Sequence, residues 1–258
     1  MKTALITGAS YGIGLELARV HAENKNNLVL VARSKDKLET LKKELEKKHN
    51  IKIHIIQKDL SLPNSAKDIY QYTKKNKITI DYLINNAGFG GFGEFKDTDI
   101  DNETNMINLN ITSLVQLTKY YLQDMIKQKQ GKIMNVASIA GFIPGPLMSV
   151  YFATKSFVVS FSQAINYEVK GTGVTVTTLC PGPTKSNFFI NANVKDNKMF
   201  SNKSIPTSRE VAEYGYKSMM KGKSIAIHGI KNRILVSLTK FIPVKYILYM
   251  TKKMQEND

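Results

Sequence analysis

The chain has 258 residues, with 37 Lys and Arg against 21 Asp and Glu and a formal net charge of +16. Hydrophobic residues make up 42% and charged residues 22%, which excludes a disordered or fibrous protein and fits one globular domain over residues 1–258. Nucleic-acid binding is not expected despite the charge, because only four basic residues are Arg, the side chain that reads bases and phosphates bidentately.

Cysteine content and hydropathy limit the cellular context. Cys180 is the sole cysteine, so the chain can form neither an intrachain disulfide nor a multi-cysteine zinc site. The first apolar run, at residues 4–6, is too short for a signal peptide, and no stretch approaches the ~18 apolar residues of a spanning helix. We therefore expect a cytoplasmic protein.

Short β-rich apolar runs alternate along the chain with longer segments of helical period. The patterns predict strands at residues 3–7, 27–32, 51–56, 80–84, 132–136, 174–179 and 224–228, and helices at 12–24, 35–48, 104–127 and 149–170. Steady alternation of strand and helix implies right-handed crossovers and a parallel sheet covered on both faces. The expected fold class is α/β, a doubly wound Rossmann-type sheet in a single domain.

The first predicted strand runs directly into a glycine-rich turn, and a helix follows. Glycines let the chain turn sharply and let backbone N–H groups approach a pyrophosphate, whose charge the helix N-terminus also favours. Isolated spacing is weak evidence, as Gly88-Phe89-Gly90 shows, but the strand–turn–helix context predicts a dinucleotide site. The expected contacts in the turn are Gly8, Ser10, Tyr11, Gly12, Ile13 and Gly14.

The end of the second strand indicates which dinucleotide is bound. An Asp or Glu there would accept hydrogen bonds from the ribose 2′-OH of NAD, but this chain has Ala32 followed by Arg33. An arginine guanidinium can donate two parallel hydrogen bonds to a 2′-phosphate. The sequence therefore predicts NADP(H) as cofactor, with Arg33 at its phosphate.

These features resemble the short-chain dehydrogenase/reductase family over nearly the whole chain. The matching segments are the first turn, Asp59-Leu60, Asn85-Asn86-Ala87-Gly88, the set Asn110, Ser138, Tyr151 and Lys155, and Pro181-Gly182. The resemblance implies that Asp59 and Leu60 contact adenine, that Asn86, Ala87 and Gly88 line the cofactor cleft, and that Pro181 and Gly182 turn beside the nicotinamide. Thr184 and Ser186 both offer hydroxyls for the carboxamide, and the sequence does not choose between them.

Tyr151 and Lys155 lie four residues apart, on one face of the predicted helix. Tyr70 with Lys74 and Tyr249 with Lys253 share this spacing, but only Tyr151 has a hydroxyl residue, Ser138, thirteen positions upstream at a strand end. We therefore expect Tyr151 to exchange the proton of the reaction.

The expected roles in the reaction follow from the resemblance and from electrostatics. Tyr151 donates a proton to a carbonyl oxygen that Ser138 also binds. Lys155 is expected to lower the phenol pKa from about 10 and to hold the nicotinamide ribose, so Tyr151 and Lys155 also count as cofactor contacts. By resemblance, Asn110 holds a water that links Lys155 to solvent. Cys180 is interpreted as a buried apolar residue rather than a catalytic thiol.

The substrate side is less defined. Residues 182–207 form the least regular stretch and are predicted to be a substrate loop. Apolar residues there and before Tyr151 suggest a pocket for a hydrophobic ketone, aldehyde or acyl chain: Phe142, Pro144, Leu147, Phe188, Phe189, Met199 and Phe200.

The C-terminal tail, residues 230–258, is basic and amphipathic. Residues 214–255 contain nine basic residues and no acidic one, and Pro243 is expected to divide the tail into two helices. An anionic membrane or an acidic carrier protein could receive such a surface. We favour the alternative that its apolar face covers the pocket or a subunit interface while the Lys residues stay solvated.

The sequence favours an NADPH-dependent reductase of a hydrophobic ketone or aldehyde. A reductase of 3-oxoacyl thioesters on an acyl carrier is the alternative, and a non-catalytic NADPH-binding regulator is disfavoured by the complete catalytic set. The resemblance also implies a homo-oligomer, a dimer or tetramer, joined through the helices predicted at 104–127 and 149–170.

Overall fold

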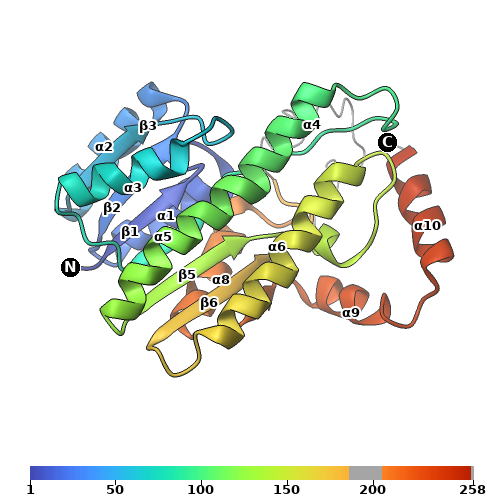
Figure 1. Ribbon diagram of the computed structural model, residues 1–258. Helices are drawn as coiled ribbons and strands as arrows, with labels where there is room; N and C mark the ends of the chain where they lie inside the picture. The colour runs from blue at the N-terminus through green and yellow to red at the C-terminus, as the bar shows by residue number, and fades with distance from the viewer. Residues whose placement is uncertain (186–204, 257–258) are drawn as a thin grey trace.

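In the computed structural model, which describes residues 1–185 and 205–256, seven parallel strands form one sheet with helices on both faces (Figure 1). The strands are β1 (Thr3–Thr7), β2 (Asn27–Ala32), β3 (Ile53–Gln57), β4 (Tyr82–Asn85), β5 (Gly131–Val136), β6 (Val174–Cys180) and β7 (Ile225–Ile227). Their spatial order is β3-β2-β1-β4-β5-β6-β7, so the chain reverses its direction of winding between β1 and β4. The doubly wound α/β prediction is confirmed.

Helices cover the sheet in two layers. They are α1 (Gly12–Glu23), α2 (Lys35–His49), α3 (Ser65–Lys75), α4 (Ile100–Ile107), α5 (Ser113–Lys127), α6 (Ser149–Glu168), α8 (Ser208–Met220), α9 (Ile230–Leu238) and α10 (Val244–Glu256). In β1, Ala4 and Ile6 belong to the core that includes α1, α2 and α8, whereas Leu5 belongs to the core that includes α3 and α5. Because both sheet faces are buried, the strands read as continuous apolar runs.

The single helix predicted at residues 104–127 is wrong. The structure divides this region into α4, a π-helical segment η1 (Asn108–Thr112) and α5, and α4 begins earlier, at Ile100. A π segment adds a residue to one turn without disturbing the apolar period on either side, so the pattern did not reveal it. Asn110 lies at the centre of this segment.

Several other boundaries differ from the prediction. β3 begins at Ile53 rather than residue 51, and β7 is shorter than expected. Helices α3 and α8 were not predicted, although α8 begins with a capping box between Thr207 and Glu210. The backbones of Lys185 and Thr207 form a bridge, which brings the ends of the predicted substrate loop together. Most of that loop, residues 186–204, lies outside the described residues, and its role stays a prediction.

The chain ends in two short helices, α9 and α10, which lie at the end of the molecule away from α2 (Figure 1). The break between them contains Pro243, as the sequence predicted. Within residues 1–185 and 205–256, no helix is both long and apolar enough to cross a membrane.

Candidate active site

A cavity of about 590 Å³ opens at the carboxyl ends of the strands. It contains residues from the turns after β1, β2, β4, β5 and β6, together with the start of α6, which is the expected place for a ligand in a doubly wound sheet. The predicted site residues that line it are Gly8, Ser10, Tyr11, Gly12, Ile13, Arg33, Asp59, Leu60, Asn86, Ala87, Gly88, Ser138, Tyr151, Lys155, Pro181, Gly182 and Thr184. One cavity therefore holds both the predicted cofactor residues and most of the predicted catalytic residues.

The turn after β1 is shaped by its glycines. Gly8 and Gly12 have φ angles of +67° and +55°, in the left-handed region that favours glycine. Gly14 is buried and does not line the cavity; a Cβ on it would lie 2.3 Å from the carbonyl oxygen of Gly8. Gly14 therefore allows α1 to begin directly against the turn, and it acts through the turn's shape rather than by lining the cavity.

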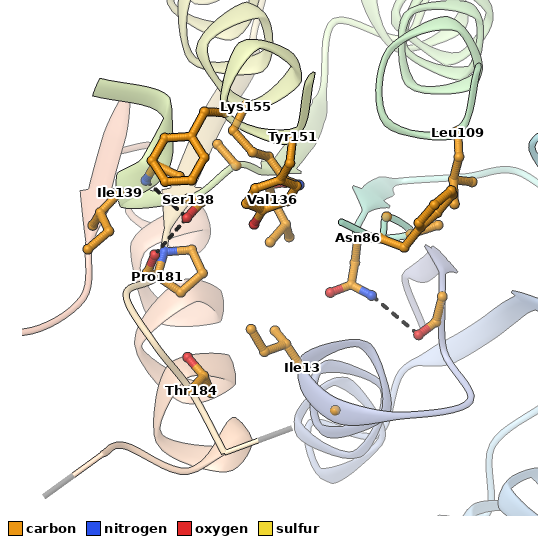
Figure 2. Close-up of a pocket in the computed structure, with 18 of the residues that line it drawn as sticks. Ile13, Asn86, Leu109, Val136, Ser138, Ile139, Tyr151, Lys155, Pro181 and Thr184 are labelled. Carbon is orange, nitrogen blue, oxygen red and sulfur yellow. Dashed lines mark hydrogen bonds between the residues drawn. The ribbon is translucent and has the colours of Figure 1, made fainter. Parts of the chain in front are cut away.

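The turn is fixed to the loop that follows β4. The Thr7 hydroxyl accepts hydrogen bonds from the backbone N–H groups of Asn86 and Ala87, each at 3.0 Å. Asn86 Nδ2 in turn donates to the carbonyl oxygens of Thr7 and Gly8, at 3.0 and 3.3 Å (Figure 2). Within the described chain, no side chain caps the N-terminus of α1, so its first N–H groups face the turn. This cradle fits a dinucleotide pyrophosphate.

Arg33 lies where the sequence placed it, at the rim of the cavity after β2. Its side chain is 78% exposed, and its guanidinium is 3.9 Å from the Asp59 carboxylate. Asp59 is held by Ser61, whose backbone N–H and hydroxyl both donate to it. Lys58 also lines this part of the cavity, although its ammonium donates to Asp68 at 2.9 Å, so Arg33 is the main candidate to bind a phosphate here.

Ser138, Tyr151 and Lys155 gather on one wall of the cavity, with Asn86 and Ile13 across from them (Figure 2). Ser138 follows β5 directly and caps a 3₁₀ turn, η2 (Ile139–Phe142). Its Oγ accepts a hydrogen bond from Ala140 N at 3.1 Å and lies 3.5 Å from the Pro181 carbonyl oxygen. The hydroxyl is thereby oriented toward Tyr151, which lies on the first turn of α6.

The pKa of Tyr151 is raised, which corrects the expectation that Lys155 lowers it. Burial raises the phenol pKa to about 12, and hydrogen bonding by Ser138 only partly opposes this. Lys155 Nζ lies 5.7 Å from the centre of the tyrosine ring. Removing the phenol from water thus outweighs its polar neighbours, and Tyr151 is protonated at neutral pH.

The Lys155 ammonium is buried and tied to the sheet. Its Nζ donates to the carbonyl oxygen of Val136, at the end of β5, at 3.0 Å. Burial lowers the pKa of Lys155 to about 8, with the nearby Cys180 acting weakly in the opposite direction. A Cβ on Gly88 would lie 2.9 Å from Asn110 Oδ1, so glycine at this position leaves room for the Asn110 side chain.

Asn110 lies behind the cavity wall and does not line the cavity. Its Nδ2 donates to the Phe89 carbonyl oxygen at 2.9 Å and to Thr154 Oγ1 at 3.0 Å, while its Oδ1 accepts from Phe89 N at 3.2 Å. The Thr154 hydroxyl itself donates to the Tyr151 carbonyl oxygen at 2.8 Å. Asn110 therefore joins the loop after β4 to α6. Sequence reasoning missed Thr154, whose neighbours along the chain carry no signal of this contact.

A second buried network supports the strand ends. Asn85 Nδ2 donates to Thr118 Oγ1 at 3.0 Å and to Asn135 Oδ1 at 2.9 Å. Asn135 Nδ2 then donates to Ser162 Oγ at 2.9 Å. These contacts join β4 and β5 to α5 and α6, so Asn85 steadies this part of the sheet.

The turn after β6 contains one of the two hydroxyl residues predicted to bind the carboxamide. Thr184 is buried, lines the cavity and donates to the Gly182 carbonyl oxygen at 2.9 Å, whereas Ser186 lies outside the described residues. Cys180 is fully buried, and burial raises its thiol pKa to about 12. Such a thiol is protonated and unreactive, in agreement with its interpretation as an apolar residue.

The competing tyrosines are far from this chemistry. Tyr70 stacks on Tyr120, with ring centres 5.1 Å apart, and Tyr249 is exposed on α10. Neither lines the cavity.

The outer part of the cavity is rich in apolar residues, and residues of the tail line it. Of the predicted pocket residues, Phe142 lines this cavity, Pro144 and Leu147 do not, and residues 188, 189, 199 and 200 are not described. Residues that were not predicted as site residues also line it: Phe89, Phe92, Leu109, Ile143, Met148, Phe152, Leu235, Val236, Thr239, Thr251, Met254 and Gln255. Part of the tail therefore lines the pocket, but most of its apolar side chains are exposed, so the favoured expectation that the apolar face of the tail covers the pocket does not hold within the described chain.

Comparison with known proteins decides the family. A family model described as short chain dehydrogenase matches residues 2–197. The chain belongs to the short-chain dehydrogenase family. It is 32% identical to a human very-long-chain 3-oxoacyl-CoA reductase, over 96% of this chain and 79% of that protein. It is 30% identical to mouse 17-beta-hydroxysteroid dehydrogenase type 3, over 96% of this chain and 83% of that protein.

Solved structures agree with this assignment. A short-chain dehydrogenase from Sphingobium yanoikuyae in complex with NADPH superimposes with a TM-score of 0.82 and 27% identity, over 93% of this chain and 94% of the other. A bulky-bulky ketone specific alcohol dehydrogenase from Comamonas testosteroni gives 0.79 and 27%, over 93% and 92%. This short-chain dehydrogenase is thus an NADP(H)-dependent oxidoreductase that interconverts a carbonyl and an alcohol, as the sequence predicted.

Proposed function

We propose that this short-chain dehydrogenase reduces a hydrophobic ketone to an alcohol, with Tyr151 as the proton donor. The observation that carries the proposal is the buried Tyr151 phenol, whose pKa of about 12 keeps it protonated, beside Ser138 in an apolar cavity. A protonated phenol is the state needed to give a proton to a carbonyl oxygen. A phenol is protonated at neutral pH at its ordinary pKa of about 10 as well, so the support for proton donation comes from the position of Tyr151 beside Ser138 in the cavity.

Each polar side chain has a distinct role in this proposal. The Tyr151 O–H bond breaks as its proton passes to the substrate oxygen, and the Ser138 hydroxyl donates a hydrogen bond to that oxygen as charge develops on it. The Lys155 ammonium, 5.7 Å from the centre of the Tyr151 ring, is the proposed source of the proton that returns to the phenolate after the reaction. Asn110 and Thr154 act as positioning residues, because they hold the loop after β4 against α6.

The cofactor residues fit NADP(H). When bound, NADPH supplies the hydride that reduces the carbonyl carbon. The turn from Gly8 to Ile13 would hold its pyrophosphate, Arg33 its 2′-phosphate, and Lys155 its nicotinamide ribose. Among the described residues, Thr184 lines the cavity with Pro181 and is the proposed partner of the carboxamide.

A 3-oxoacyl thioester is the substrate class with a specific argument in its favour. The human and macaque relatives that match 96% of this chain are very-long-chain 3-oxoacyl-CoA reductases by name. The apolar outer wall, with Phe92, Met148 and Phe152, suits a long acyl chain. In rat, however, the matched segment spans 58% of that reductase, so the similarity alone does not carry the substrate to this chain.

A panel of NADPH oxidation assays tests the proposal. The substrates are a short free ketone, a long-chain 3-oxoacyl-CoA and the same acyl group on an acyl carrier protein, with NADH as the cofactor control. We expect turnover of a long-chain substrate with NADPH, at a higher kcat/KM than for the short ketone. Tight NADPH binding with no turnover of any carbonyl would favour a non-catalytic regulator and contradict the proposal.

We also propose an oligomeric state for the protein. Phe157 and Phe161 on α6 stack on each other, and Phe157 and Ile126 of α5 are exposed apolar side chains. This surface supports a homo-oligomer formed through α5 and α6. The cytoplasmic location stays a prediction.

A further inference from the structure

Helix α10 has its apolar side chains on the outside. Its buried residues are Ile247, Thr251 and Gln255, which are spaced four residues apart, and two of these three are polar. Val244, Tyr246, Tyr249 and Met250 are exposed instead. A helix that packs on a protein core in the ordinary way buries its apolar face, so α10 is arranged for an apolar environment beyond the protein.

Helix α9 continues the same surface. Val236 is its one buried residue. Ile230, Ile234 and Leu238 recur at four-residue spacing and are all exposed, and Phe241, just beyond the helix, is 84% exposed. We call these residues, with the exposed apolar residues of α10, the apolar face. The apolar face extends over two adjoining helices, whereas exposed apolar residues on an ordinary protein surface are scattered singly.

The charges around the apolar face are mostly positive. Residues 230–256 contain six basic residues, among them Lys240 and Lys245 beside the break at Pro243, and one acidic residue, Glu256, which lies 3.3 Å from Lys252. In a twofold dimer formed through this face, each positive surface would meet an identical one, which is unfavourable. The charge therefore favours an anionic partner over a second copy of the chain.

The dimensions favour a lipid surface. Helices α9 and α10 have 9 and 13 residues, too short for the ~20 residues that span a bilayer. Short helices with exposed apolar and aromatic side chains beside Lys residues are suited to lie in the headgroup region of an anionic membrane. An acidic carrier protein would meet the charges but would leave much of this broad apolar surface without a matching environment.

The same face leads into the cavity. Leu235 and Met254 both line the cavity, yet they are 49% and 52% exposed. These two apolar side chains thus belong both to the outer surface of α9 and α10 and to the lining of the cavity. Gln255 lines the cavity nearby, and its buried Oε1 has no hydrogen-bond partner among the described residues. An entering molecule could supply that partner.

We propose that α9 and α10 dock on an anionic lipid membrane and that a hydrophobic substrate enters the cavity between them from the bilayer. The docking stands by itself, whereas the route of entry rests on the proposed reductase function.

Vesicle sedimentation tests the docking. The purified full chain is mixed with phosphatidylcholine vesicles that contain or lack phosphatidylserine, at low and at high salt. We expect sedimentation with phosphatidylserine vesicles at low salt and release at high salt. The double variant K240E/K245E should reduce the bound fraction at least about tenfold, since each Lys near the surface contributes roughly fivefold to binding. The variant F241D should also reduce binding, through its apolar contact.

Matched controls separate this surface from general charge. K47E/K48E makes the same charge change on α2, far from α9 and α10 in Figure 1, and Tyr167→Asp removes an exposed aromatic residue from α6. Both controls should bind vesicles nearly as well as the unchanged chain. Equal loss in the α2 variant, no sedimentation at low salt, or a dimer that F241D converts to a monomer in ultracentrifugation would each overturn the docking.

Activity measurements separate the docking from the reductase function. With a short water-soluble ketone, K240E/K245E should keep the kcat/KM of the unchanged chain, because neither Lys lines the cavity. With a long-chain carbonyl compound held in phosphatidylserine vesicles, its rate should fall in parallel with its binding. Equal rates on the vesicle-held substrate would overturn entry from the bilayer. Normal sedimentation without any reduction would contradict the reductase function and leave the docking intact.

Discussion

The ammonium of Lys155 donates to the carbonyl oxygen of Val136 at 3.0 Å, which fixes a buried cation at the end of β5. The same burial that lowers the pKa of Lys155 to about 8 raises that of Tyr151 to about 12. Desolvation thus moves the two groups toward their neutral forms, a phenol and an amine. The proton that the reaction consumes is held by Tyr151, and Lys155 changes its charge nearer to physiological pH.

The rate of carbonyl reduction should fall as the pH rises through about 8. Lys155 loses its proton in this range and can no longer return one to the phenolate, whereas Tyr151 stays protonated up to about pH 12. The kcat/KM for NADPH-dependent reduction, measured from pH 6 to pH 10 in steps of roughly half a unit, checks this. A profile that stays flat to pH 10 would remove Lys155 from the proton path.

Replacing Lys155 by Met should stabilise the fold while it impairs catalysis. Below about pH 8 the folded protein bears the full cost of a buried ammonium, and this cost is relieved between pH 8 and 10.5 as folded Lys155 releases its proton. At pH 7, Met avoids the cost but leaves the Val136 carbonyl without its donor, so we expect a gain of roughly 1–2 kcal/mol in unfolding free energy. Denaturant titrations at pH 7 and pH 10 should show the gain shrinking at the higher pH. A lower stability of the variant at pH 7 would contradict this account.

Thr154→Val should reduce kcat by about tenfold or more while NADPH still binds. The variant loses the hydroxyl that joins Asn110 to the backbone at Tyr151, at a stability cost of roughly 1–3 kcal/mol. Thr118→Val is the matched control, because it removes a buried hydroxyl from Asn85 at a distance from the reacting groups. The control should lose similar stability and keep its kcat. Equal losses of kcat in both variants would show that Thr154 has only a structural role.

Arg33→Ala should raise the KM for NADPH by roughly 10- to 100-fold, with kcat nearly unchanged, because a charge-assisted contact contributes about 1–3 kcal/mol. The KM for NADH should change little. Lys43→Ala on α2, the helix that follows Arg33, removes a cation that does not line the cavity, and steady-state kinetics with both cofactors compare the two variants. A similar rise of the KM for NADH would mean that Arg33 does not recognise the 2′-phosphate.

The sequence alone was sufficient to place those site residues that function requires at the ends of particular strands. Gly8, Arg33, Ser138 and Tyr151 could each be placed because a turn, a terminus or a fixed offset identifies them. The two-faced core of the sheet also followed from uninterrupted apolar strands.

The remainder depends on contacts between distant residues. The carbonyl oxygen of Val136 is a backbone atom that any residue type would supply, and Thr154 resembles any other helical Thr until Asn110 is placed beside it. The direction of the Tyr151 pKa shift was also beyond the sequence, because burial of a side chain is decided by packing around the whole cavity. The relation of Leu235 and Met254 to the cavity needed the course of the tail.

The central claim, that Tyr151 donates the proton, is tested most directly by a single-turnover measurement on Tyr151→Phe. The variant keeps the ring and removes only the hydroxyl, so NADPH should bind as tightly as in the unchanged protein, as measured by cofactor fluorescence. We expect the rate of hydride transfer to a competent ketone to fall at least about a hundredfold, the lower range for loss of a positioned acid. Transfer at the unchanged rate with NADPH fully bound would contradict the account.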